Sequence, residues 1–335
     1  MKESPKPKRR HKKRKIIVAV IISFIVMIGI VFAGFLLLYQ GSQGKLDQLK
    51  VSETKKHKEY EEIIQSAVLP EGWSAETLST LQSAALAAYD TSLIDKVDKA
   101  FNGDASAAKE LENVTSSTQP ASVEKYRTIF SSLKSYPEDL IKLAASNPEY
   151  LDFVAAYTSQ SQSPSQAEAL SITDFSVVPN LKTFDPSWGY IPYAGTLFAN
   201  SGSAPTAIAM TFAYLTDNPA FTPALLAQFA KDYGYEFEPI KDNDTIFAGA
   251  AYGYGINMIP LSKYPTPISQ AISQGTVAVL QLQDGEGSKF VVVPSINEDG
   301  TWKVYDPSVP GDPKAVNPDS IQDQILSACA YYYYG

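Results

Sequence analysis

The residues from Ile16 to Leu38 form an uncharged and almost wholly apolar run, IIVAVIISFIVMIGIVFAGFLLL. As an α-helix this run is about 34 Å long, against about 30 Å for the hydrocarbon core of a bilayer. Only Ser23 breaks its apolar character, whereas a helix at the surface of a globular core shows a polar face. We therefore predict a single transmembrane helix over residues 16–38. No A-x-A triplet follows it, so we expect an uncleaved anchor.

The charge beside this run predicts its orientation. Residues 1–15 contain nine Lys and Arg and one acidic residue. Because basic flanks stay in the cytoplasm, we predict a basic cytoplasmic tail over 1–15 and an extracytoplasmic position for everything after Tyr39. The predicted location is the cell membrane, crossed once. The whole chain carries a net charge of -8, and its acidic remainder argues against a nucleic acid partner.

The body of the chain lacks the residues that most nucleophilic and metal-dependent chemistry needs. Both histidines, His11 and His57, precede residue 59, and Cys329 is the one cysteine. These counts exclude a multi-cysteine zinc site, and they exclude Ser-His-Asp or Cys-His machinery in the later part of the chain. We predict no metal and no cofactor. Cys329 lies in an apolar context typical of a buried structural cysteine.

The spacing of apolar residues and the Pro and Gly signals between them predict helices in the earlier part of the chain and strands in the later part. Thr222-Pro223 and Thr266-Pro267 each carry the signal of a helix start, and Gly234 and Gly275 that of a helix end. Three strands and one hairpin turn are expected after these helices: Val277–Leu282, Phe290–Val293, Trp302–Tyr305 and the turn Asp299-Gly300. This order is typical of an α+β domain.

The predicted organisation has four parts. They are a basic cytoplasmic tail (1–15), a transmembrane helix (16–38), a helical stalk with membrane-proximal helices (39–135) and the α+β domain (136–335). The last residues, Tyr331–Tyr334, fit either a final packed strand or an exposed tail, and the sequence leaves both open.

Ser203 is the first residue whose setting suggests chemistry. It lies in the segment NSGSAPTAIAMTFAYL, at the expected N-terminus of a helix. A nucleophile there gains from the helix dipole, which favours negative charge. Serine is also a good N-cap, so a purely structural role fits the same residues.

Four short patches together resemble the papain-like cysteine peptidases, in particular their bacteriocin-processing-like branch, common in Gram-positive surface proteins. In chain order they are Thr183–Tyr190 (TFDPSWGY) beside the family's QWDxRWGY, Gly202–Thr206 (GSAPT) beside GCGPT, Ser288–Phe290 (SKF) beside GHF, and Tyr305–Pro307 (YDP) beside nDP. The resemblance covers residues 136–330 and implies a papain-like domain, with a helical part and an antiparallel sheet.

The resemblance also implies roles for single residues. Ser203 falls where the family has its nucleophilic cysteine, and Lys289 where it has the general-base histidine. Thr183 falls at the oxyanion glutamine, whereas Asp306 keeps the aspartate that orients the imidazole. Three of the four roles have changed chemistry, so these are predicted to be vestigial positions. The candidate residues of a binding cleft are Trp188, Tyr190, Tyr193 and Ser203.

Three functions follow from this interpretation. The favoured one is a membrane-anchored, extracytoplasmic pseudo-peptidase that binds a peptide or a cell-wall-associated partner without cleaving it. The second is a hydrolase with a Ser203–Lys289 pair, which needs a neutral lysine. Because Asp306 holds Lys289 protonated if it keeps its family position, we expect a Lys289–Asp306 ion pair instead. The third is a structural surface spacer without a ligand.

Overall fold

The computed structural model describes residues 27–28, 30–31, 43–160, 169–236, 245–285 and 287–334. The chain divides into two compact units. The first comprises Met1–Ser66 and Leu86–Val123, and the second comprises Ala67–Ala85 and Glu124–Gly335. The units are therefore interleaved along the chain, because the second takes up a short segment between the two parts of the first.

No helix in the described ranges is long and apolar enough to cross a membrane. This finding corrects the prediction of a transmembrane helix over 16–38, and with it the fold class that began with such a helix and the single-pass location at the cell membrane. Of the apolar run, only residues 27–28 and 30–31 are described, and they are helical. The rest of the run and the predicted tail 1–15 lie outside the described residues.

The first unit is built from helices. Its described part contains a helix over residues 43–65, α3 (Ser92–Phe101) and α4 (Ala105–Glu110). Leu46 and Leu49 of the first helix pack with Val97 of α3 in a small apolar core. The side chain of Asp104 caps α4, since its carboxylate accepts the N–H groups of Ser106 and Ala107.

The second unit begins with short helices. They are α2 (Ala75–Ala87), α5 (Ala121–Ser131), η1 (Leu133–Ser135), α6 (Glu138–Ser146), η2 (Pro148–Tyr150), α7 (Leu151–Ala156) and η3 (Tyr157–Ser159). The boundary between the units falls within α2 and within α5, so residues 86–87 and 121–123 belong to the first unit. Glu138 at the start of α6 fastens α2, because one carboxylate oxygen accepts the N–H of Ser74 at 2.8 Å and the hydroxyl of Thr77 at 2.7 Å. The segment before residue 86 is thereby held to the later part of the same unit.

A six-stranded antiparallel sheet follows, in the order β3-β8-β4-β5-β6-β7, together with the small pair β1-β2. The strands are β1 (Pro192–Tyr193), β2 (Thr196–Leu197), β3 (Asn257–Leu261), β4 (Val277–Asp284), β5 (Gly287–Ile296), β6 (Trp302–Tyr305), β7 (Lys314–Val316) and β8 (Ile325–Tyr332). The helices are α8 (Phe198–Ser201), α9 (Ser203–Thr216), α10 (Pro223–Tyr233), α11 (Ile246–Tyr254), α12 (Pro265–Ser273), α13 (Pro318–Ile321) and η4 (Gln322–Gln324).

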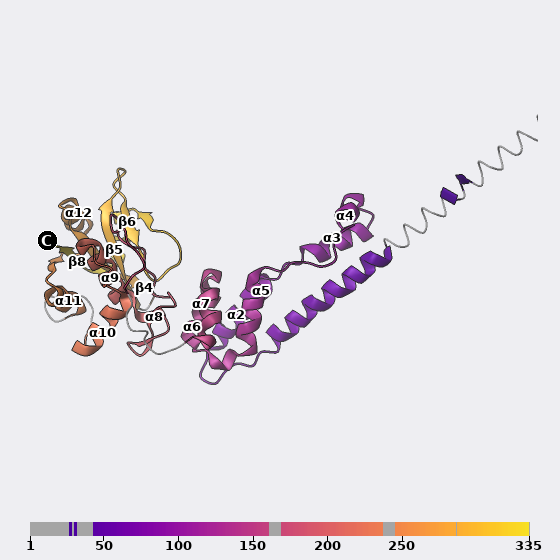
Figure 1. Ribbon diagram of the computed structural model, residues 1–335, viewed down its shortest axis with the longest axis horizontal. Coiled ribbons are helices and arrows are strands. Elements are labelled where there is room, and N and C mark those ends of the chain that lie inside the picture. The colour runs from indigo at the N-terminus through magenta and orange to yellow at the C-terminus, as the bar shows by residue number, and fades with distance from the viewer. Residues whose placement is uncertain are drawn as a thin grey trace, which may run out of the picture. The chain divides into compact units, whose positions relative to one another are not determined.

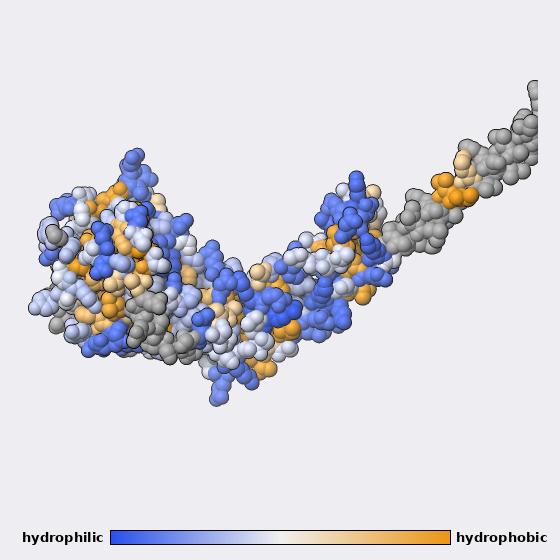
Figure 2. Space-filling view, viewed as in Figure 1, coloured by the Kyte–Doolittle hydropathy of each residue, from blue (hydrophilic) through white to orange (hydrophobic). Residues whose placement is uncertain are grey.

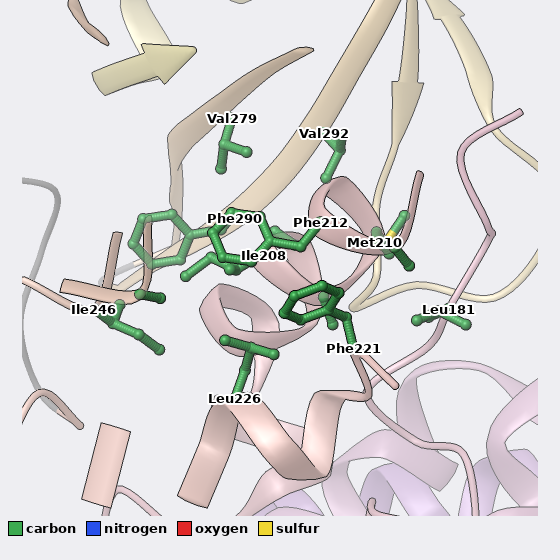
Figure 3. Packing of buried hydrophobic residues seen from close by; sticks show 14 of the residues in the cluster. Leu181, Ile208, Met210, Phe212, Phe221, Leu226, Ile246, Val279, Phe290 and Val292 are labelled. Atoms are coloured by element: carbon green, nitrogen blue, oxygen red, sulfur yellow. The ribbon is translucent and has the colours of Figure 1, made fainter. Parts of the chain in front are cut away.

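Both faces of this sheet are buried. Phe290 and Val292 of β5 face a core that includes residues of α9, α10 and α11, whereas Val291 and Val293 face a second core with residues of α12. This is the alternation expected of a strand. Figure 1 shows the strands β4, β5 and β6 with α9 and α12 beside them. In Figure 3, Phe290 and Val279 of the sheet point toward Ile208 and Phe212 of α9.

The structure tests the element predictions one by one. The three strands and the turn at Asp299-Gly300 are confirmed, as is α10, where the Thr222 hydroxyl accepts the N–H of Leu225 and Gly234 is left-handed. The predicted start of α12 at Thr266-Pro267 is wrong. Its N-cap is Tyr264, which precedes Pro265 and is extended (φ -92°, ψ 147°), as the ring of a following proline favours.

The C-terminal tyrosines combine the two structures that the sequence left open. β8 runs through Tyr332 and pairs with both β3 and β4, and Tyr331 is fully buried. Tyr334, beyond the strand, is 84 % exposed.

Candidate functional site

Ser203 begins α9 and is buried. Its Oγ accepts the backbone N–H of Phe290 in β5 at 3.3 Å. The preceding residue must be small, because a Cβ at Gly202 would lie 2.4 Å from the Phe198 ring. The helix start is thus packed tightly between α8 and the beginning of β5.

Lys289 and Asp306 lie together. The Nζ of Lys289 is 2.9 Å from Oδ2 of Asp306 and 3.9 Å from Oδ2 of Asp284. The other carboxylate oxygen of Asp306 accepts the N–H of Ser308 at 2.9 Å. The predicted Lys289–Asp306 ion pair is therefore present, and the Lys289 side chain is engaged by a carboxylate.

The sheet separates this ion pair from Ser203. Lys289 is the cross-strand partner of Leu282, which belongs to the core on the α12 face. Directly opposed residues share a face, so Lys289 leaves the sheet away from α9. Ser203 instead meets the backbone of Phe290, whose ring lies in the core on the α9 face. Among the described residues, no hydrogen bond joins Ser203 to Lys289.

Thr183, at the predicted oxyanion position, is engaged within the protein. It is 1 % exposed, its hydroxyl donates to the carbonyl of Ala199 at 2.8 Å, and its N–H donates to the carbonyl of Pro307 at 2.9 Å. A hydroxyl that donates to a carbonyl has no second hydrogen for an oxyanion. Thr183 thus joins α8 to the loop after β6.

That loop, residues 306–308, collects hydrogen bonds from distant parts of the unit. Besides Thr183, the Nζ of Lys182 donates to the Asp306 carbonyl at 2.9 Å, and the Tyr150 hydroxyl donates to the Ser308 carbonyl at 2.6 Å. Burial, with the charge of Asp306 nearby, raises the pKa of Tyr150 to about 12. Burial lowers the pKa of Lys182. The sequence did not predict the roles of Tyr150 and Lys182. Their hydrogen bonds end on backbone carbonyls, which leave no pattern of side chains to recognise.

The predicted cleft residues do not share one cleft. Trp188 and Tyr190 line a cavity of about 710 Å³, but Tyr193 and Ser203 are not among its lining residues. The three aromatic side chains are buried. The indole N–H of Trp188 donates to the Lys182 carbonyl at 2.7 Å, and the Tyr190 hydroxyl donates to the Phe153 carbonyl at 2.7 Å. Their rings are therefore fixed in place.

Other chemistry has little support in the part of the chain that the structure describes. No group of three or more His, Cys, Asp or Glu side chains there is arranged to hold a metal ion. Cys329 is fully buried in β8, and burial raises the pKa of its thiol to about 12, which keeps it protonated and unreactive.

No protein-family model matches the chain, and no curated protein is significantly similar to it in sequence. The resemblance to papain-like peptidases therefore continues to depend on the four sequence patches.

Proposed function

We propose that the second unit is a non-catalytic, peptidase-like module that binds a peptide, and that its vestigial catalytic positions stabilise the fold. The observation that carries this proposal is the Lys289–Asp306 ion pair. Lys289, at the family's general-base position, forms an ion pair with Asp306, at the family's orienting position.

Catalysis by Ser203 lacks support on three grounds. A serine hydroxyl is protonated near neutral pH and needs an adjacent base. No histidine follows His57 in the sequence, and Lys289 is both paired and on the opposite face of the sheet. Loss of a nucleophile or its base costs on the order of 10⁶ in kcat in a serine protease.

A cavity supports binding over a purely structural spacer. Its volume of about 710 Å³ falls within the range of about 300–1,000 Å³ that is usual for ligand sites, and fixed aromatic rings form part of its wall. Figure 2 shows that the visible face of the second unit is covered largely by hydrophilic and intermediate residues, with small hydrophobic areas between them.

The test uses the full chain and a random octapeptide library displayed on beads. We expect a minority of beads to retain fluorescently labelled protein, equally for the wild type and Ser203→Ala, and no peptide to be cleaved. A fluorogenic peptide library provides the cleavage readout. Turnover that disappears in Ser203→Ala would falsify the non-catalytic assignment. Bead retention no higher than that of heat-unfolded protein would refute the binding function.

A further inference from the structure

The cavity lined by Trp188 and Tyr190 lies apart from the vestigial catalytic positions. Its walls come from Gln160, from residues in the stretches 169–172 and 180–191 and from the start of α10, whereas Ser203, Lys289 and Asp306 do not line it. A ligand can therefore occupy this cavity without contacting any position at which the resemblance implies catalysis.

The aromatic part of the wall is fixed before any ligand binds. Tyr190 stacks on Phe153 with ring centroids 4.2 Å apart and an angle of 1° between the planes. The polar atoms of Trp188 and Tyr190 already donate to backbone carbonyls. Trp188 is 7 % exposed and Tyr190 is 1 % exposed, so these rings form a rigid backing of the cavity wall, and they lose little conformational entropy when a ligand binds.

Lys182 is the one cation among the described residues that line the cavity. Its Nζ donates one hydrogen bond, to the Asp306 carbonyl, which leaves two of the three ammonium hydrogens. Burial lowers the pKa of this lysine although the charges of Asp306 and Asp312 act in the opposite direction, so a ligand carboxylate beside it would offset more of the lost hydration.

Asp185 is the one anion of the same lining. One of its oxygens accepts the Ser187 N–H at 2.8 Å, which fixes the carboxylate in a turn. Its charge repels an acidic group placed beside it. An acidic ligand group therefore has one favourable position, next to Lys182.

We infer that this cavity is the peptide site of the second unit and that it takes an acidic peptide, whose carboxylate pairs with Lys182. The inference rests on the proposed function, since it names the site and the ligand class for the same binding activity.

Two bead libraries of octapeptides test the inference, one with aspartate and one with lysine fixed at the fourth position. We expect the full chain to favour the aspartate library. Lys182→Met keeps the aliphatic stem and removes the charge, and we expect at least tenfold weaker binding to the best aspartate peptide, the scale of a lost charge-assisted hydrogen bond. Its matched control is Lys263→Met, an exposed lysine outside the cavity lining.

A second variant leaves Lys182 unchanged. Ala224→Leu fills space at the start of α10, and its control is Ala271→Leu on α12, which does not line the cavity. We expect Ala224→Leu to weaken binding and the control to leave it unchanged. Tryptophan fluorescence during urea unfolding identifies any variant that fails to fold.

The outcomes separate the two proposals. Binding that is unchanged by Lys182→Met or by Ala224→Leu, or a preference for the lysine library, overturns this inference and leaves the proposed function in place. An absence of binding to every bead refutes the proposed function and the inference together.

Discussion

The ion pair between Lys289 and Asp306 yields a quantitative prediction about stability. The two side chains are 23 % and 18 % exposed, and Nζ and Oδ2 are 2.9 Å apart. With an effective dielectric constant of about 40, Coulomb's law gives about 3 kcal/mol of attraction. Exposed pairs contribute about 0.2–1 kcal/mol, whereas breaking a buried pair costs about 3–5 kcal/mol. We therefore expect Lys289→Met to lower the free energy of unfolding by about 2 kcal/mol.

A double-mutant cycle isolates the pair. Asp306→Asn removes the charge and keeps an oxygen that accepts the Ser308 N–H, so the turn is preserved. We expect a coupling free energy of about 1.5 kcal/mol between Lys289→Met and Asp306→Asn. Asp284, at 3.9 Å from Nζ, retains part of the attraction in the second single variant, which keeps this coupling below the total.

Urea unfolding followed by tryptophan fluorescence measures these changes. Trp73, Trp188 and Trp302 are the three tryptophans of the chain, and all belong to the second unit. Lys314→Met on exposed β7 is the control and should change stability by less than about 0.5 kcal/mol. A coupling below about 0.3 kcal/mol would refute the reasoning, because the vestigial pair would then contribute nothing to the fold.

Four further outcomes are expected. Hydrogen bonds from Lys56 and Ser117 outweigh burial and hold the pKa of Glu53 below its usual value, so the stability of the first unit should fall as the pH drops below about 4.5. Glu53→Gln should lower the free energy of unfolding by about 1–2 kcal/mol and flatten this pH dependence, as followed by circular dichroism. Gly202→Ala should destabilise by about 1–3 kcal/mol in urea, because the new methyl group meets a ring. Trp302→Ala should cost about 3–5 kcal/mol in the same assay, since that side chain is fully buried. The Cys329 thiol should react with a thiol reagent only in denaturant, and rapid labelling of the native protein would contradict its burial.

Local sequence signals predicted the elements whose start and end are set by particular capping or turn residues. The Thr222-Pro223 start and the Gly234 end determine α10 through a hydrogen-bonded cap and a left-handed exit. Asp299-Gly300 determines the turn between β5 and β6, because Gly300 adopts the positive φ of +84° that this turn requires. The sheet order could not be predicted, because β3 and β8 pair across about 70 residues and no local pattern encodes that partnership.

The candidate site was predictable in part. The ion pair of Lys289 with Asp306 followed from opposite charges at positions that the resemblance placed together. The separation of Ser203 from Lys289 depends on which face of β5 each side chain meets, and a one-residue change of register reverses that face. The bonds from Tyr150 and Lys182 to the 306–308 loop end on carbonyls, which every residue possesses.

The interleaving of the two units has a consequence for any attempt to divide this protein. Because Ala67–Ala85 belongs with Glu124–Gly335, no single cleavage of the backbone separates the two units. A fragment that ends at Val123 still carries Ala67–Ala85 of the second unit, and one that starts at Ala67 still carries Leu86–Val123 of the first. A fragment that starts at Glu124 lacks α2 and leaves the Glu138 carboxylate without Ser74 and Thr77. Separating the units would require excising Ala67–Ala85 or Leu86–Val123 and joining the remaining parts with a new linker. During synthesis, α2 gains its contacts with Glu138 only after the whole intervening part of the first unit has been made.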